Sequence, residues 1–560
     1  MTRARRVLRV AALGLGTLGL GGACSTPGLS PVELETEPQE ENQLQLTAFK
    51  DVDVLFVIDN SGSMGEEQAN LAMNFGAFIE VLEAYDVEAN YRVGVTTTDN
   101  GNPWCPTGVT TPEGGKLVMS SCRSRIQDFV FEGVGEPLDA RDLACNDICA
   151  LDDEQLQLLP TTTDVDPNPA PRPWLENIEG SVNVPAGVST VEAFRCFGPQ
   201  GINGCGFESP LESMYLALVR AESPEEASYG FLRQSALLAV VFVTDELDCS
   251  YAKQWSEIFE ADGNKAFWGD PNENFPTSAL CWNAGVECVG DPTLYDDCVA
   301  ANYDVNGLPA SDDEAVLQPL SRYYQFLDAL ENEKRIYNPD NELIVGLIGG
   351  VQPDGSLVYA EVDDTDPEFA LNFGIGPGCT GPLGEAAVPP VRLRELTDNY
   401  TPDNLHSICS TDYTGALERI ADEVRDEIIP ACYYRCAADT DPETELIDAV
   451  CEVEQTLPDG QTRELQECQR DAAGAYAFDP SSNAYVMPST EARACYVVRT
   501  DPGTLSEDPR DDIAPYCVDS GANLELKIAY APGFPEPAGT QTRASCVVSD
   551  QPEQDCPGLG

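Results

Sequence analysis

Short apolar runs alternate with amphipathic stretches between residues 51 and 430. Runs of this kind are typical of strands buried on both faces of a parallel sheet, because neither face can then carry polar side chains. The strands predicted in this way are 54–58, 91–97, 237–243 and 343–348.

Apolar residues at helical spacing follow the runs and predict helices. In the first stretch, one helix face carries Leu71, Phe75, Phe78, Ile79 and Leu82. Strands that alternate with helices indicate an α/β fold, here a doubly wound and mostly parallel sheet with helices on both sides. The predicted helices are 65–84, 210–221, 315–330 and 413–428.

Two segments interrupt this alternation, and the pattern changes again after residue 430. Residues 101–200 and 250–312 are rich in turn residues and cysteines, so we interpret them as disulfide-braced insertions in the first domain, 51–430. Residues 431–560 contain short apolar runs, many turn residues and eight cysteines. This composition predicts a small β-rich domain held by disulfides.

The first 50 residues have the composition of an export signal and a spacer. Several arginines precede the apolar stretch 10–20 and the small residues before Cys24, which predicts a signal peptide over 1–23. The segment resembles a bacterial lipoprotein processing site, which implies a lipidated Cys24 and a flexible linker over 24–50. Leu20 lies four residues before Cys24, whereas the leucine of that family usually lies three residues before the cysteine. Cleavage after Ala23 without a lipid is the alternative.

Cysteine parity favours export and lipidation. Of 21 cysteines, 20 are left if Cys24 carries a lipid, and this even number can pair completely. Ten disulfides imply an oxidising compartment. Zinc is a poor alternative because the chain has one histidine, His406, and free thiolates oxidise outside the cell.

The net charge of −65 excludes some classes of partner. A surface this acidic repels nucleic acids and anionic lipid headgroups, so we expect neither as a ligand. The membrane is therefore expected to hold the chain through the lipid alone.

The loop after the first predicted strand carries the clearest candidate chemistry. Asp59, Ser61 and Ser63 place one carboxylate and two hydroxyls at alternating positions beyond the carboxyl end of strand 54–58. Ligands of open α/β sheets bind at this edge. Hard oxygen donors suit Mg²⁺ better than a soft metal.

This pentapeptide resembles the Asp-x-Ser-x-Ser motif of von Willebrand factor A domains, which are similar to integrin I domains. The resemblance implies a metal-ion-dependent adhesion site whose ligands come from three loops. Asp59, Ser61 and Ser63 match the first loop, and Asp245, after strand 237–243, matches the third. The runs 196–208 and 244–250 also resemble a cysteine-rich bacterial subgroup of A-domain lipoproteins.

The second loop departs from the family, which has a threonine before the helix at 210. Counting back from Leu211 reaches Cys205, which we expect in a disulfide, and the nearby oxygen donors are Glu208 and Ser209. If Glu208 takes the threonine's place, the metal gains a negative ligand and prefers Ca²⁺ or Mn²⁺ to Mg²⁺.

The carboxylates after Asp245 have two interpretations. Glu246 and Asp248 form either a second Ca²⁺ site or a solvated acidic loop held by a Cys249 disulfide, and the solvated loop is favoured. Enzymatic motifs are weak: Ser61 has no glycine two residues before it, as a nucleophile elbow requires, and a Ser-His-Asp triad could use only His406. We therefore expect a non-enzymatic protein.

Together these features predict a lipoprotein of the cell envelope, at the bacterial outer membrane, that acts as a monomer in cell adhesion. By resemblance, an Asp or Glu carboxylate of a protein or matrix ligand completes the coordination of the metal. Two alternatives stay open. The metal of a structural envelope protein would only stabilise the fold, and a metal-dependent hydrolase would use it to activate water.

Overall fold

The computed structural model describes most of the chain from residue 44 onward. Residues 1–23, Cys24 and most of the linker 24–50 lie outside the described residues. The chain divides into two units, Met1–Asn42 and Gln43–Gly560. No helix among the described residues is long and apolar enough to cross a membrane. The described residues are 44–46, 50–84, 87–105, 110–132, 137–337, 341–360, 367–382, 384–428, 430–441, 446–457, 460–471, 474–479, 484–502, 505, 508, 510–531, 534 and 540–556.

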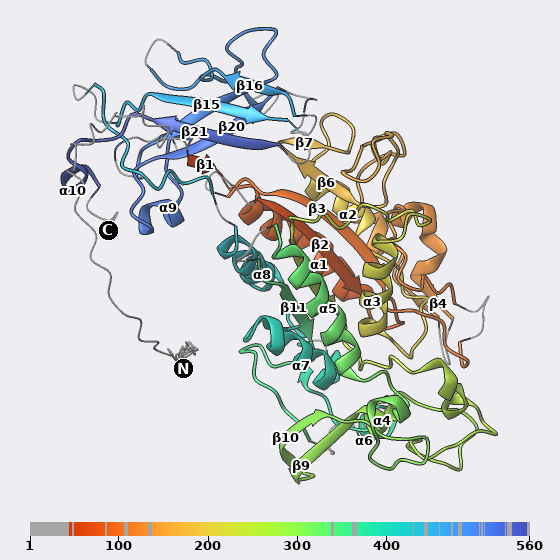
Figure 1. The fold of residues 1–560 in the computed structure, drawn as a ribbon. Coiled ribbons are helices and arrows are strands. Elements are labelled where there is room, and N and C mark those ends of the chain that lie inside the picture. Colours follow the sequence, from red (N-terminus) through yellow and green to blue (C-terminus); the bar gives the residue numbers. More distant parts are fainter. Residues whose placement is uncertain are drawn as a thin grey trace, which may run out of the picture. The chain divides into compact units, whose positions relative to one another are not determined.

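A seven-stranded, mostly parallel sheet forms the centre of the larger unit (Figure 1). Its order is β14-β11-β8-β2-β3-β6-β7, and the first five strands are parallel to their neighbours. The other two strands extend the edge in antiparallel pairing. In sheet order the strands are Leu405–Ser407, Ile344–Gly349, Leu237–Val243, Asp51–Ile58, Asn90–Thr97, Leu175–Ile178 and Ser181–Val182.

Helices cover both faces of this sheet, as predicted. On one face, α1 (Gly65–Leu82), α2 (Thr190–Phe197) and α8 (Thr414–Asp426) pack on alternate residues of β2 such as Phe56. On the other face are α3 (Pro210–Ala221), α5 (Leu320–Lys334) and α7 (Val391–Tyr400). Because successive side chains of a strand point to opposite faces, β2 contributes to both cores.

The predicted elements agree with the structure to within a few residues, except that the third helix begins at Leu320 instead of 315. The sequence interpretation missed α7 and β14. It also treated all of 101–200 as an insertion, whereas β6, β7 and α2 belong to the sheet and its core. These elements are short, and their place depends on partners far away in the chain.

The insertion at 250–312 contributes Phe259, Trp268, Leu280 and Trp282 to a third apolar cluster, which it shares with residues before 250 and after 312. Parts of residues 101–140 and 367–387 add further short elements. They are α4 (Ala279–Gly285), α6 (Pro367–Phe373), β4 (Val130–Phe131), β5 (Leu138–Asp139), β9 (Val286–Asp291), β10 (Leu294–Ala300), β12 (Cys379–Thr380) and β13 (Ala386–Ala387).

The region after residue 430 is β-rich, as predicted. One sheet has the order β1-β21-β15-β16, and β19 pairs with β20. Strand β1 comes from the predicted linker, so residues 44–46 are structured within this sheet. The elements are β1 (Leu44–Leu46), β15 (Cys451–Thr456), β16 (Thr462–Leu465), β17 (Phe478–Asp479), β18 (Ala484–Tyr485), β19 (Ala494–Arg499), α9 (Pro515–Asp519), β20 (Glu525–Tyr530), β21 (Gln541–Cys546) and α10 (Pro552–Asp555).

All twenty cysteines other than Cys24 form disulfides, which confirms the pairing predicted from parity. Six bonds lie before residue 430 and four after it, so none joins the two regions that the sequence separates. The pairs are Cys105–Cys205, Cys122–Cys145, Cys149–Cys196, Cys249–Cys281, Cys288–Cys298, Cys379–Cys409, Cys432–Cys517, Cys436–Cys556, Cys451–Cys546 and Cys468–Cys495.

Loop length predicts the contribution of these bonds to stability. The Cys105–Cys205 bond spans 100 residues, although two disulfides inside this loop shorten the free chain. Replacing both cysteines with alanine is expected to lower the free energy of unfolding by about 3–4 kcal/mol. The matched change at Cys288 and Cys298, 10 residues apart, is expected to cost about 2–3 kcal/mol. Unfolding in guanidinium would contradict this ranking if the Cys288/Cys298 variant lost more free energy of unfolding than the Cys105/Cys205 variant.

Candidate metal centre

Three loops meet at the carboxyl edge of the central sheet because the register of its strands places their ends side by side. Ile58 pairs with Thr97 on β3 and with Val243 on β8. The next residues, Asp59, Thr98 and Thr244, therefore leave the sheet together. This is the edge at which open α/β sheets bind ligands.

Asp59 is fully buried at the centre of these loops and is held by hydrogen bonds to both carboxylate oxygens. Oδ1 accepts from the Ser61 backbone N–H at 2.8 Å and from the Thr98 hydroxyl at 3.3 Å. Oδ2 accepts from the Thr244 hydroxyl at 2.6 Å. Burial raises the pKa of Asp59, and these hydrogen bonds oppose the increase.

Ser61 and Ser63 direct their hydroxyls toward each other, with 3.4 Å between the two Oγ atoms. Ser61 is buried, whereas Ser63 is exposed and gives the loop its contact with solvent. A hydrogen bond with the Ser63 side chain lowers the pKa of Asp245, against the stronger effect of burial. The structure thus brings together the serines of the first loop and the aspartate of the third.

Glu208 of the second loop belongs to the same cluster and is 1% exposed. Burial raises its pKa well above the ordinary value, and the charges of Glu246, Asp59 and Asp245 add to the increase. Asp245 and Glu246 behave alike: burial raises each pKa strongly, and repulsion from neighbouring carboxylates raises it further. Cys205, at the position of the family's threonine, pairs with Cys105 as expected.

Each of these three carboxylates has a buried oxygen without a hydrogen-bond partner among the described residues. These atoms are Glu208 Oε1, Asp245 Oδ1 and Glu246 Oε2. None of the ion pairs formed by the described residues involves them or Asp59. Buried carboxylates are normally paired with a cation or bound to a metal, because an isolated buried charge is costly. The donor set is entirely oxygen, which fits a hard divalent cation.

Backbone contacts hold the loops in place. The Gln68 side chain donates to the Asp59 carbonyl at 2.6 Å and accepts from the Gln200 N–H at 2.7 Å, which links the first and second loops. The Gly204 N–H donates to the Asn60 carbonyl at 2.7 Å. A Cβ atom at Gly204 would lie 2.4 Å from the Asn60 side chain, so this close approach requires glycine.

Asp248 does not belong to a solvated acidic loop, which corrects the favoured interpretation of the sequence. It is 3% exposed and pairs with Arg392 at 2.9 Å. Its other oxygen accepts from the Leu211 N–H at the start of α3 and from the Ser250 hydroxyl. Asp248 therefore fixes α3, and the expected Cys249 disulfide is present.

Sequence reasoning did not identify Thr98, Thr244 or Gln68. All three act through hydrogen bonds to Asp59 that depend on strand register or on a helix face. The position of Thr98 and Thr244 directly after predicted parallel strands was the signal that could have identified them. His406 is buried, its ring bonded to Asn404 and Arg419, and burial followed by the Arg419 charge lowers its pKa to about 4.

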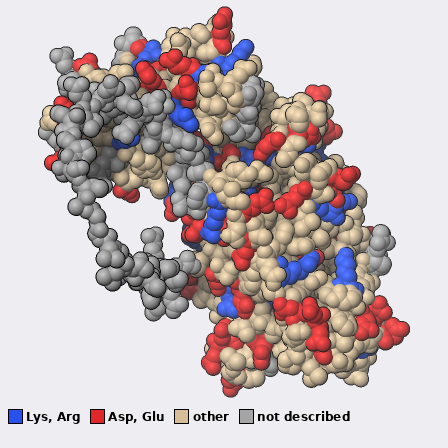
Figure 2. Space-filling view, in the orientation of Figure 1, with Lys and Arg blue, Asp and Glu red and all other residues tan. Residues whose placement is uncertain are grey.

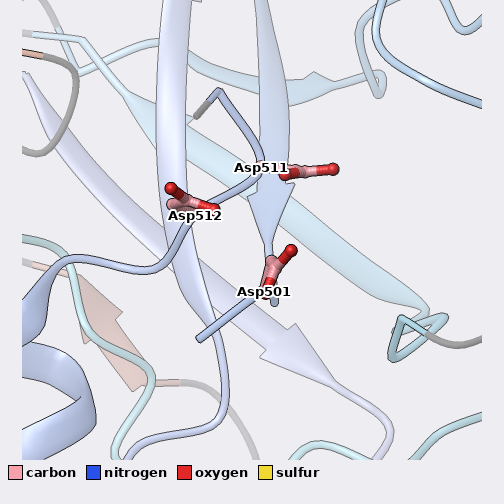
Figure 3. A group of neighbouring side chains, drawn as sticks. All are labelled: Asp501, Asp511 and Asp512. Atoms are coloured by element: carbon pink, nitrogen blue, oxygen red, sulfur yellow. The ribbon is translucent and has the colours of Figure 1, made fainter. Parts of the chain in front are cut away.

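A separate acidic group lies in the β-rich region. The carboxylate oxygens of Asp501, Asp511 and Asp512 lie within 4.8 Å of one another (Figure 3). The carboxylates around Asp59 do not form so close a trio among the described residues, so an ion there would also need the serine hydroxyls. Asp501 accepts hydrogen bonds from the Leu505 N–H. Nothing beyond the proximity of these acids points to a ligand.

Comparisons with known proteins give little information. No family model and no curated protein matches the chain. Similar solved structures include the pilus adhesin SpaC of Lactobacillus rhamnosus GG in its open conformation (TM-score 0.25, 10% identity, 90% of this chain and 39% of that one). The pilus adhesin RrgA of Streptococcus pneumoniae is another (TM-score 0.21, 11% identity, 91% of this chain and 58% of that one). The chain thus spans less than two thirds of either protein, and likeness at these TM-scores carries no argument.

The buried carboxylates predict a pH dependence in the absence of divalent cations. Burial raises the pKa of Glu67, on α1, from 4.5 to about 7. The stability that protonated Glu67 contributes is complete below about pH 4.5 and is lost as the pH rises through 7. At 1.36 kcal/mol for each pH unit between the two pKa values, the loss is about 3 kcal/mol.

Thermal unfolding in EDTA between pH 5 and 8 tests this expectation. The wild type should lose stability relative to Glu67→Gln as the pH rises, because glutamine stays neutral. A difference in melting temperature that is constant across the pH range would contradict the prediction.

Proposed function

We propose that this chain is an exported, non-enzymatic adhesion protein that binds a protein or matrix ligand through a divalent cation. The cation would be held by Ser61, Ser63, Asp245 and Glu208 at the carboxyl edge of the central sheet. The observation that carries the proposal is the set of buried carboxylate oxygens without a hydrogen-bond partner beside the two serine hydroxyls.

The residues have separable roles in this proposal. Both oxygens of Asp59 already accept hydrogen bonds from Ser61, Thr98 and Thr244, so Asp59 would orient the loop and add negative charge. Asp245 and Glu208 each have an oxygen that accepts no hydrogen bond from the described residues and would be available to the ion. With a carboxylate from the second loop, Ca²⁺ and Mn²⁺ are expected to compete well with Mg²⁺. The bound ion would supply positive charge that attracts an acidic side chain of the ligand.

An A-type domain, as the Asp59–Ser63 motif implies, is compatible with the mixed sheet and its two helical layers. Ser63 is the exposed member of the cluster, so a ligand carboxylate would approach there. Acidic side chains are spread over the visible face (Figure 2), which would disfavour the approach of acidic partners at other positions. We propose that the chain acts as a monomer.

Export and anchoring belong to the same proposal. Ten disulfides form and persist in an oxidising compartment, which supports a location outside the cytoplasm. A lipid on Cys24 would hold the chain at the cell envelope, and we propose the bacterial outer membrane. Parity supports the lipid, because Cys24 is the one cysteine that the ten pairs leave over.

The deep burial of Glu208 and Asp245 favours one rival function. A site with two buried carboxylates could saturate an ion and leave no position for a ligand, so that the metal would only stabilise the fold. The two functions make the same prediction for cation binding but differ for ligand binding.

Cation binding is tested by titrating the chelated full chain with Mg²⁺, Ca²⁺ and Mn²⁺ and following its melting temperature. Each cation is expected to raise the melting temperature, since it binds only the folded state. Ser61→Ala and Asp245→Asn should each reduce the apparent affinity by about tenfold or more, equivalent to about 1.4 kcal/mol. Ser181→Ala, an exposed serine on β7, is the matched control. Equal shifts in Ser61→Ala and Ser181→Ala would reject the site.

Ligand binding separates the two functions. The full chain is applied to a panel of immobilised matrix and envelope proteins in Mg²⁺ and, separately, in EDTA. The adhesion proposal expects binding in Mg²⁺ that EDTA abolishes, that Ser61→Ala loses and that Ser181→Ala retains. A chain that binds the cation but no member of the panel would support the stabilising role instead.

A further inference from the structure

A cavity of about 480 Å³ lies at the opposite edge of the central sheet from Asp59. Its lining includes Lys50 and Asn90, at the amino ends of β2 and β3, and Glu179, after β6. Tyr485 of β18 and Lys527 of β20 line it from the β-rich region. This volume lies within the range of about 300–1,000 Å³ that is usual for small-molecule sites, which often lie where two regions of a protein meet.

Glu88 is the centre of a group of ion pairs beside this cavity, whose lining also includes Glu83 and Glu179. Glu88 contacts Arg499 at 3.0 Å and Lys50 at 3.8 Å, and it also forms an ion pair with Lys527. Arg499 pairs in addition with Glu525 at 3.3 Å. Burial would raise the pKa of Glu88, but the three cations outweigh it and lower the pKa to about 2. Two of the chain's six lysines are used here, in a protein whose net charge is −65.

Backbone strain is concentrated around the same cavity. Among the described residues, three that are not glycine have positive φ, and two of them, Glu88 at 47° and Glu179 at 49°, line it. Residues other than glycine adopt this conformation rarely, and such strain tends to occur at functional sites. Reciprocal hydrogen bonds with the Asn90 side chain, at 2.8 and 3.0 Å, hold Glu179 in place.

Polar acceptors and aromatic rings form the walls. The Asn177 Oδ1 atom is buried and accepts no hydrogen bond from the described residues, although its Nδ2 donates to Glu83 at 2.9 Å. The rings of Phe478 and Tyr485 pack edge to face with their centres 5.4 Å apart. Lys50, Glu88 and Lys527 keep 15–21% of their side-chain surface exposed, so the ion pairs remain accessible.

We infer that this cavity binds a neutral, hydroxyl-rich ligand, namely a short oligosaccharide. Ion pairs offer donors and acceptors side by side, which suits the adjacent hydroxyls of a sugar ring, and aromatic rings suit its C–H faces. An anion would have to displace Glu88 from its three cations. A cationic ligand would compete with Lys50 and Lys527, which are already in place. The site is independent of the proposed cation site at the other edge.

Calorimetric titration of the full chain with maltotriose, cellotriose, chitotriose and mannotriose tests the inference. The buffer contains EDTA, so that the Asp59 cluster cannot contribute through a metal. At least one trisaccharide is expected to bind. Ala484→Trp, which fills the cavity without removing a polar group, should weaken that binding by about tenfold or more.

The matched control is Ala492→Trp, because Ala492 is also half-buried in the β-rich region but does not line the cavity. It should bind the sugar like the wild type. The inference is overturned if no trisaccharide binds, if Ala484→Trp binds as well as Ala492→Trp, or if phosphate or a lysine-rich peptide occupies the cavity instead.

Discussion

The cost of burying like charges is the constraint on which the rest of this structure depends. Asp59, Glu208, Asp245 and Glu246 gather at one edge of the central sheet, and each carboxyl has its pKa raised by burial. Two states can relieve the repulsion: proton uptake, or a cation among the oxygens. Strand register, the Gln68 clamp and the Cys105–Cys205 disulfide all hold these loops together against that repulsion. Either state would lower the free energy of the folded chain relative to the fully ionised cluster.

The two edges of the central sheet carry opposite chemistry. Among the described residues, the carboxyl edge has buried carboxylate oxygens without a partner, whereas the amino edge has Glu88 paired with three cations. Near that edge, Asp53 and Arg233 form a further buried pair at 2.8 Å. Because β2 runs from one edge to the other, a rigid strand separates the proposed cation site from the cavity. The two sites can therefore be tested separately.

The elements that the sequence predicted are those whose signal is local. Buried strands and long amphipathic helices have a period that can be recognised without knowing their partners. Strand β14 and helix α7 were missed because their burial depends on packing against β11 and α5. Spacing and the family resemblance pointed to Ser61, Ser63 and Asp245. Counting back from Leu211 pointed to the neighbourhood of Glu208. The network around Glu88 joins residues 411 positions apart, and no local pattern could have indicated it.

Asp248 provides an internal comparison for the candidate metal centre. It lies three residues after Asp245, in the same loop and at similar burial, yet the chain supplies Arg392 to it from 144 residues away. The fold can therefore place a guanidinium next to a buried carboxylate in this region. Among the described residues it places none next to Asp245 or Glu208, where burial instead raises the pKa of each carboxyl. Asp248 thus keeps its charge beside a fixed arginine, whereas the repulsion at Asp245 and Glu208 can be relieved either by proton uptake or by a cation from solution.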